Sequence, residues 1–189
     1  MRFAAAPSQY LGGMEEGQGW LKDYIRDIPD FPQPGVVFKD ITPLLCDGDA
    51  LASCVEALAD AFSDKPVDKV IGIEARGFIV AAPVAVSLGA GFVPVRKAGK
   101  LPWRVRSEEY QLEYGTDSLE IHADALNPGE RVLIIDDVLA TGGTAAATAR
   151  LVAGGSAEVV GFGCIIELAF LGGAGKLDSL EAVSLLRYE

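Results

Sequence analysis

The sequence predicts an α/β fold with a central parallel sheet flanked by helices. Four short β-branched runs, residues 67–73, 92–95, 132–135 and 159–166, are predicted strands. Apolar helical segments or one long excursion connect them, and connections of that length favour parallel strands with right-handed crossovers. Ligands of such sheets bind beyond the carboxyl ends of the strands.

The 189 residues suit one domain with a core of its own. Half of the residues are apolar and 23% are charged, which is typical of a globular chain. Residues 1–19 are small, polar and Gly-rich without periodicity. We therefore expect a loose leader there, ahead of a single domain over residues 20–189.

Helices are expected where apolar side chains recur at helical spacing. Residues 20–28 show this pattern until Pro29 stops it, and the Pro-rich residues 31–35 then predict an extended or turning segment. Residues 49–62 and residues 144–153 are two further predicted helices.

The long uncharged stretch over residues 77–95 predicts a buried helix, a turn and a strand. Pro83, Gly89 and Gly91 divide it too finely for a membrane span. The formal net charge of -11 argues against a general nucleic-acid binder, since phosphate-backbone affinity needs clustered basic residues.

The three cysteines, Cys46, Cys54 and Cys164, have no C-x-x-C spacing and no nearby histidine cluster. We therefore expect neither a disulfide framework nor a zinc site. A reducing compartment fits such cysteines, and the first residues lack the apolar stretch of a signal peptide. We expect a cytoplasmic protein.

Residues 95–132 form a long excursion between two predicted strands, and residues 110–126 within it alternate like a β-ribbon. An insertion at this end of a sheet favours a lid. Five of the 16 basic residues lie in one short part of it: Arg96, Lys97, Lys100, Arg104 and Arg106. Composition alone favours a solvated basic loop.

The strongest motif is VLIIDDVLATGGT, residues 132–144, in which a buried strand, two acids and a loop of small residues precede an Ala-rich helix. Such a loop leaves backbone amides bare, and the positive end of the helix points at the same place. The residues that would hold a phosphate are Ala140, Thr141, Gly142, Gly143 and Thr144.

Asp136 and Asp137 would accept hydrogen bonds from vicinal hydroxyls, so a ribose 5-phosphate fits this motif. Side chains alternate along a strand, so the two acids share a ligand only where the strand is ending. The alternative is a pair of solvated acids before a glycine turn.

These residues resemble the ribose-phosphate signature of the type I phosphoribosyltransferases, and the chain resembles the adenine-specific members of that family. Further similar segments follow in order at similar spacing: residues 31–45, 71–78, 95–102, 112–126 and 184–189. The resemblance implies the type I phosphoribosyltransferase fold, with a small hood over residues 20–45 and a flexible β-ribbon lid over residues 96–122.

The resemblance also implies the roles of individual residues. The pyrophosphate-binding residues would be Glu74, Ala75, Arg76, Arg96, Lys97, Lys100 and Tyr114, with a cis peptide bond between Glu74 and Ala75. The alternative for residues 74–76 is a plain turn between a strand and a helix. Related enzymes carry Asp and Ser where this chain has Glu74 and Ala75.

The resemblance assigns base recognition to Val37, Phe38 and Lys39. A Phe ring stacks on purines, and a backbone amide and carbonyl match the N1 acceptor and exocyclic amine of adenine. Phe38 could equally be a core residue. Lys39 stands where Arg is common in the family, and Lys lacks the two-pronged donor of Arg.

The implied reaction joins adenine to phosphoribosyl pyrophosphate and gives AMP and pyrophosphate, a step of purine salvage. Glu113 is the candidate that helps adenine lose its N9 proton, and Arg76 is the other catalytic candidate. An exposed ribbon residue is the alternative for Glu113, and His122 is expected to be structural. Mg²⁺ would be held mainly by substrate and water.

The family usually forms homodimers, and we expect one here. Two rival functions remain: a phosphoribosyltransferase for xanthine or guanine, and a regulatory sensor of phosphoribosyl pyrophosphate that binds DNA. The base-binding segment speaks against the first. The sensor would need a DNA-binding domain and a basic surface, which this acidic sequence does not predict.

Overall fold

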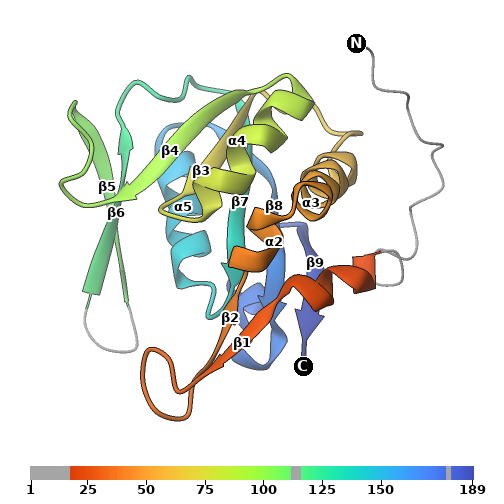
Figure 1. The fold of residues 1–189 in the computed structure, drawn as a ribbon. Helices are drawn as coiled ribbons and strands as arrows, with labels where there is room; N and C mark the ends of the chain where they lie inside the picture. Colours follow the sequence, from red (N-terminus) through yellow and green to blue (C-terminus); the bar gives the residue numbers. More distant parts are fainter. Residues whose placement is uncertain (1–17, 112–115, 178–179) are drawn as a thin grey trace.

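A seven-stranded sheet organises the computed structural model, which describes residues 18–111, 116–177 and 180–189. The strand order is β5-β6-β4-β3-β7-β8-β9, and the neighbours from β4 to β9 run parallel (Figure 1). The β4–β6 and β5–β6 pairs are antiparallel. The predicted α/β class with a central, mostly parallel sheet is therefore confirmed.

The strands of this sheet are β3 (Lys69–Ile73), β4 (Gly91–Lys97), β5 (Val105–Gln111), β6 (Thr116–His122), β7 (Arg131–Leu139), β8 (Glu158–Leu168) and β9 (Ala182–Tyr188). All four predicted strands are present. β7 runs four residues past the predicted end because β8 is long enough to pair with it as far as Leu139 opposite Glu167.

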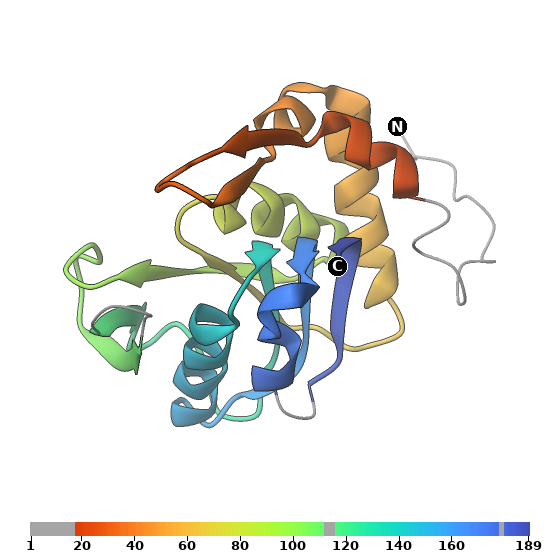
Figure 2. The same cartoon turned by 90° about the horizontal axis from the view of Figure 1, so that it is seen from below.

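Helices cover both faces of the sheet (Figure 2). α3 (Gly48–Ala61) and α4 (Gly77–Leu88) lie on one side, and α5 (Gly143–Gly154) lies on the other. One buried cluster includes Leu58 of α3 and Phe62, which follows that helix. A second buried cluster includes Leu151 of α5. The predicted helices over residues 49–62 and 144–153 are thus present with nearly the predicted bounds.

Short elements complete the chain. They are the 3-10 helices η1 (Gly19–Tyr24), η2 (Ala169–Leu171) and η3 (Gly173–Lys176), the helix α2 (Thr42–Cys46), and the strands β1 (Arg26–Pro29) and β2 (Val37–Asp40). Among the described residues, no helix is long and apolar enough to cross a membrane. Residues 1–17 of the expected leader lie outside the described residues.

The expected helix over residues 20–28 is wrong beyond Tyr24. Residues 26–29 instead form β1, which pairs antiparallel with β2 in a sheet of its own. The apolar residues there have helical spacing, but backbone pairing with β2 outweighs it. The turn between the two strands, which contains two prolines, brings β2 next to β1. This hairpin belongs to the segment expected to be the hood.

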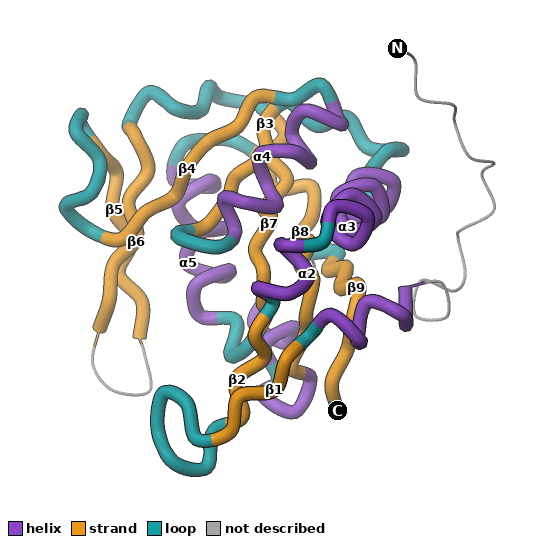
Figure 3. The backbone as a smooth tube through the Cα atoms, viewed as in Figure 1, coloured by secondary structure: helices purple, strands orange, loops and turns teal. Residues whose placement is uncertain are grey.

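The β5–β6 ribbon packs against α5 (Figure 3). Tyr110, Leu119 and Ile121 belong to the same buried cluster as the residues of α5. The Arg150 guanidinium of α5 forms an ion pair with Glu108 of β5 at 2.5 Å. The base of the expected lid is therefore part of the core, and only its tip, residues 112–115, lies outside the described residues.

Candidate active site

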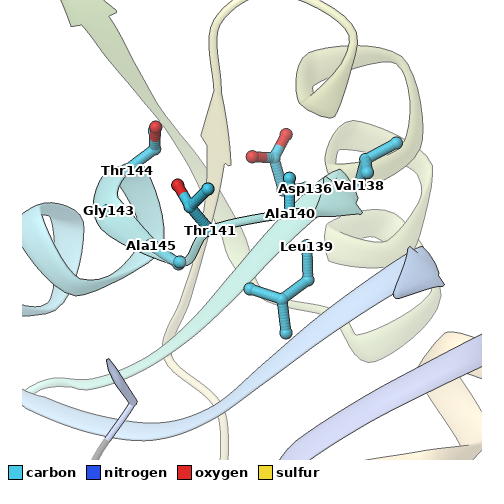
Figure 4. Close-up of a pocket in the computed structure, with 9 residues that line it drawn as sticks. Asp136, Val138, Leu139, Ala140, Thr141, Gly143, Thr144 and Ala145 are labelled. Atoms are coloured by element: carbon cyan, nitrogen blue, oxygen red, sulfur yellow. The ribbon is translucent and has the colours of Figure 1, made fainter. Parts of the chain in front are cut away.

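The loop between β7 and α5 forms a small cavity of about 80 Å³ at the carboxyl end of the sheet. Its lining residues are Asp136, Val138, Leu139, Ala140, Thr141, Gly142, Gly143, Thr144 and Ala145. The side-chain oxygens of Asp136, Thr141 and Thr144 lie on one side of the loop (Figure 4). No side chain caps the first turn of α5, so its amides are free to bind an anion.

Two glycine backbones hold the shape of this loop. Gly142 has φ 73°, the left-handed conformation that glycine adopts without strain. A Cβ on Gly142 would lie 2.3 Å from the carbonyl oxygen of Gly173, and a Cβ on Gly173 would lie 2.1 Å from that of Ala140. The η3 segment therefore supports the loop directly, a contact that the sequence alone did not indicate.

Asp136 and Asp137 interact with each other and with Arg76. The backbone amide of Asp137 donates to Asp136 Oδ1 at 2.9 Å, and Arg76 Nε lies 2.7 Å from Asp137 Oδ2. Burial, followed by the neighbouring charge of Asp137, raises the pKa of Asp136 well above its usual range. Burial and the neighbouring acid thus both disfavour the charged form of Asp136.

The peptide bond between Glu74 and Ala75 is cis, as the family resemblance implied. The Glu74 side chain is 9% exposed and accepts hydrogen bonds from Arg96 Nε at 3.3 Å, from the Lys97 amide at 3.0 Å and from Lys100 Nζ. Burial alone would raise the pKa of Glu74, but these donors lower it below its usual value. The structure thus brings Glu74, Arg96 and Lys100 together.

Lys97 points its side chain to a different partner. Its Nζ lies 3.2 Å from Asp117 Oδ2 on β6, and the Tyr110 hydroxyl donates to the same oxygen at 3.3 Å. The hydrogen bond from Lys97 lowers the pKa of Asp117 and raises that of Lys97. Sequence reasoning missed Asp117 and Tyr110, because ordinary strand alternation gives no sign of a shared partner across the ribbon.

The predicted base segment lies on β2, and its three side chains go to different places. The Phe38 ring centroid lies 5.0 Å from the Arg76 guanidinium carbon. Val37 is 50% exposed, and Lys39 Nζ forms an ion pair with Asp27 at 2.7 Å. Arg76 therefore contacts both Phe38 and Asp137, whereas Lys39 pairs with Asp27.

Three other predictions concern residues away from these contacts. Glu113 and Tyr114 lie outside the described residues. His122 ends β6 opposite Val105, and its buried Nε2 has no hydrogen-bond partner in the described part of the chain. Within residues 18–111, 116–177 and 180–189, no group of three or more acidic, histidine or cysteine side chains is placed to hold a metal ion.

A family model described as the phosphoribosyl transferase domain matches residues 47–183. This is well over half of the chain and includes β3, β4, the loop between β7 and α5, and both acids of β7. The chain therefore belongs to the phosphoribosyltransferase family.

Within this family, the chain is similar to proteins named adenine phosphoribosyltransferase. The one from Acidothermus cellulolyticus is 59% identical over 164 residues, which is 87% of this chain and 93% of that protein. The crystal structure of the Rhodothermus marinus protein is 51% identical, with a TM-score of 0.88 over 92% of this chain and 99% of that one.

A third similar structure is that of Saccharomyces cerevisiae adenine phosphoribosyltransferase in a complex that includes adenine. It is 37% identical, with a TM-score of 0.85 over 90% of this chain and 98% of that chain. These matches confirm the resemblance seen in the sequence.

Proposed function

We propose that this protein is an adenine phosphoribosyltransferase, which converts adenine and phosphoribosyl pyrophosphate to AMP and pyrophosphate in purine salvage. The relatives with this name are similar over nearly the whole chain. The observation that carries the proposal is Arg76, which lies between the aromatic ring of the hood and the acids beside the phosphate loop. One guanidinium thus contacts a residue of the proposed base site and a residue of the proposed ribose site.

The substrate would be held along the carboxyl end of the sheet. The 5-phosphate would accept hydrogen bonds from the amides and hydroxyls of residues 140–144, as the uncapped start of α5 favours. Asp136 and Asp137 would accept hydrogen bonds from the ribose hydroxyls. Phe38 would stack on the base, and the backbone of Val37 would offer its amide to N1 of adenine and its carbonyl to the exocyclic amine.

This backbone pattern selects adenine over hypoxanthine and guanine. Both of those bases present a donor at N1 and an acceptor at C6, so each would place donor against donor and acceptor against acceptor. A buried mismatch of this kind leaves polar groups unpaired and lowers affinity strongly.

In the reaction, adenine N9 bonds to the anomeric carbon while the bond from that carbon to a pyrophosphate oxygen breaks. The leaving oxygen keeps the electron pair, and Glu113 would take the N9 proton. Arg76, Arg96, Lys97 and Lys100 are proposed to counter the charge that grows on pyrophosphate. To do so, Arg96 and Lys100 would have to leave Glu74 or be shared with it, and Lys97 would have to do the same with Asp117.

The chain is proposed to work as one domain over residues 20–189, with the hood over the base and the lid, through Tyr114, over the pyrophosphate. Mg²⁺ would arrive with the pyrophosphate, whose oxygens are the hard ligands that it prefers, and would offset part of its charge. All three cysteines are free thiols. This suits the reducing cytoplasm, where we propose that the protein acts.

We propose a homodimer because α4 exposes apolar side chains on one face. The helix GFIVAAPVAVSL contains no charged residue, and a helix that is apolar on all sides is normally covered on all sides. Yet Val86 is 81% exposed, and Ile79, two turns earlier on the same face, is 46% exposed. A second copy of the chain would cover this face.

The experiment that tests the proposal measures AMP formation from phosphoribosyl pyrophosphate and Mg²⁺ with adenine, hypoxanthine, guanine or xanthine. We expect turnover with adenine alone. The double substitution Asp136→Asn/Asp137→Asn should abolish it, whereas Asp68→Asn, which breaks an ion pair with Arg131 at the opposite end of the sheet, should not. Turnover with another base would overturn the base assignment, and no turnover with any base would favour a regulatory sensor.

A further inference from the structure

The Lys39 ammonium lies between two groups that have no place in the proposed chemistry. It pairs with Asp27 Oδ1 at 2.7 Å, and it lies 4.3 Å from the centroid of the Tyr188 ring. The side chain is only 15% exposed. A cation at this distance from an aromatic ring is attracted by the negative face of the ring. Lys39 is therefore held by both partners at once.

The two partners belong to different parts of the fold. Asp27 lies directly opposite Lys39 in the β1–β2 hairpin. Tyr188 is the last residue of β9, where it pairs with Leu168 of the main sheet. The Lys39 side chain thus connects the hairpin to the edge strand of the sheet.

The β1–β2 hairpin needs such a connection. It is a two-stranded sheet that does not join the main sheet, and isolated hairpins of two strands are marginally stable. Phe31 at its turn and Val37 are each about half exposed. Two of the contacts of β2 reach beyond the hairpin: Lys39 contacts Tyr188, and the neighbouring Phe38 contacts Arg76.

We infer that Asp27, Lys39 and Tyr188 form a latch. This latch holds the β1–β2 hairpin in the position in which Phe38 stacks on the base. Lys39 is then a positioning residue, whose side chain acts through the hairpin and does not bind adenine itself. This inference rests on the proposed function for the identity of the base. It differs from the family-based expectation that the Lys39 side chain recognises the base.

The latch and direct base binding predict different results for Asp27→Asn, Tyr188→Leu and Lys39→Met. A latch predicts that all three variants raise the KM for adenine, by about tenfold for Tyr188→Leu and Lys39→Met, while the KM for phosphoribosyl pyrophosphate changes by less than about twofold. Tyr188→Phe, which keeps the ring, and Lys39→Arg, which keeps the cation, should stay close to wild type. Lys69→Met, which removes a lysine paired with Glu130 elsewhere, is the matched control.

Hydrogen exchange of the backbone amides tests the latch without turnover. Tyr188→Leu and Asp27→Asn should speed exchange in residues 26–29 and 37–40 relative to the core strand β7, and Lys69→Met should not. Unchanged exchange in both variants would overturn the latch, as would a KM for adenine that rises in Lys39→Met alone. If wild type makes no AMP from adenine, the proposed function fails, and the exchange rates still decide whether the latch exists.

Discussion

Arg76 Nε lies 2.7 Å from Asp137 Oδ2, so a residue just before α4 is tied to an acid on β7. The same guanidinium lies over Phe38 of the hairpin. The Arg76 side chain is 37% exposed, whereas that of Asp137 is 9% exposed, so the cation remains open to a ligand while the acid is covered. A substrate that reaches from base to ribose would pass this guanidinium.

Replacing Arg76 should therefore impair catalysis much more than stability. For Arg76→Gln we expect kcat/KM for phosphoribosyl pyrophosphate to fall by about 100-fold, because a positioned cation is lost where charge develops. Steady-state kinetics and thermal melting measure the two effects. The control is Arg131→Gln, which breaks the ion pair with Asp68 and should leave kcat/KM within about twofold. Equal kcat/KM losses in both variants would assign Arg76 a structural role only.

Gly142→Ala should distort the loop between β7 and α5, which is the proposed phosphate site. The new Cβ would collide with the carbonyl oxygen of Gly173 at 2.3 Å, so the loop or η3 must shift. We expect the KM for phosphoribosyl pyrophosphate to rise by at least about tenfold, because a misplaced loop loses hydrogen bonds to the phosphate.

The matched control for this change is Gly89→Ala. Gly89 also has a positive φ, 67°, but nothing lies within 4 Å of its added Cβ. Both variants should lose about 1–2 kcal/mol of stability from backbone strain alone. Only Gly142→Ala should lose more than this and raise the KM, as denaturant unfolding and kinetics would measure. A similar KM in both variants would contradict the close contact with Gly173.

Four strands of the main sheet, β3, β4, β7 and β8, could be predicted from the sequence because they contain short apolar, β-branched runs. β9 could not be predicted, since its sequence AVSLLRY shows no clear alternation of apolar and polar residues. Its strand character comes from pairing with β8. For a similar reason, the sequence predicts a helix at residues 26–28 of β1. Its residues gain their backbone partners only when the turn at residues 30–36 brings β2 back to β1.

The loop between β7 and α5 could be predicted because glycines, hydroxyls and a following helix stand together in one short motif. The partners of the cations could not. Glu74 lies 22 residues before Arg96, and Asp117 lies on another strand from Lys97, so only the fold brings them together. The same is true of Tyr188, whose contact with Lys39 joins residues from opposite ends of the domain.

Val86→Glu should dissociate the proposed dimer. Val86 is 81% exposed on an uncharged helix, and a carboxylate there would be buried without a partner if another copy covers this face. Sedimentation velocity should show a monomer for this variant and a dimer for wild type. Ala52→Glu, on the exposed side of α3, should remain dimeric. A dimeric Val86→Glu protein would place the interface elsewhere.

Asp136→Asn should stabilise the protein without ligand at neutral pH. The pKa of Asp136 is raised in the folded state by burial and by Asp137, above an ordinary value of 3.8. Folding therefore takes up a proton at pH values above 3.8, and stability falls as the pH rises through this window. Asn does not ionise and keeps the oxygen that accepts from the Asp137 amide, so the variant escapes this loss.

Thermal melting between pH 2 and pH 8 measures this effect. We expect the Tm of Asp136→Asn to exceed that of wild type by a few degrees at pH 7.5, since about 1 kcal/mol shifts the Tm of a domain of this size by roughly 2–4 °C. The difference should shrink toward zero near pH 4. Asp68→Asn should behave in the opposite way, because hydrogen bonds from Arg131 lower the pKa of Asp68 in the folded state. That variant should melt below wild type at neutral pH, and the gap should close as the pH falls below 3.8. If the Tm difference of Asp136→Asn does not vary with pH, Asp136 is already ionised in the folded protein.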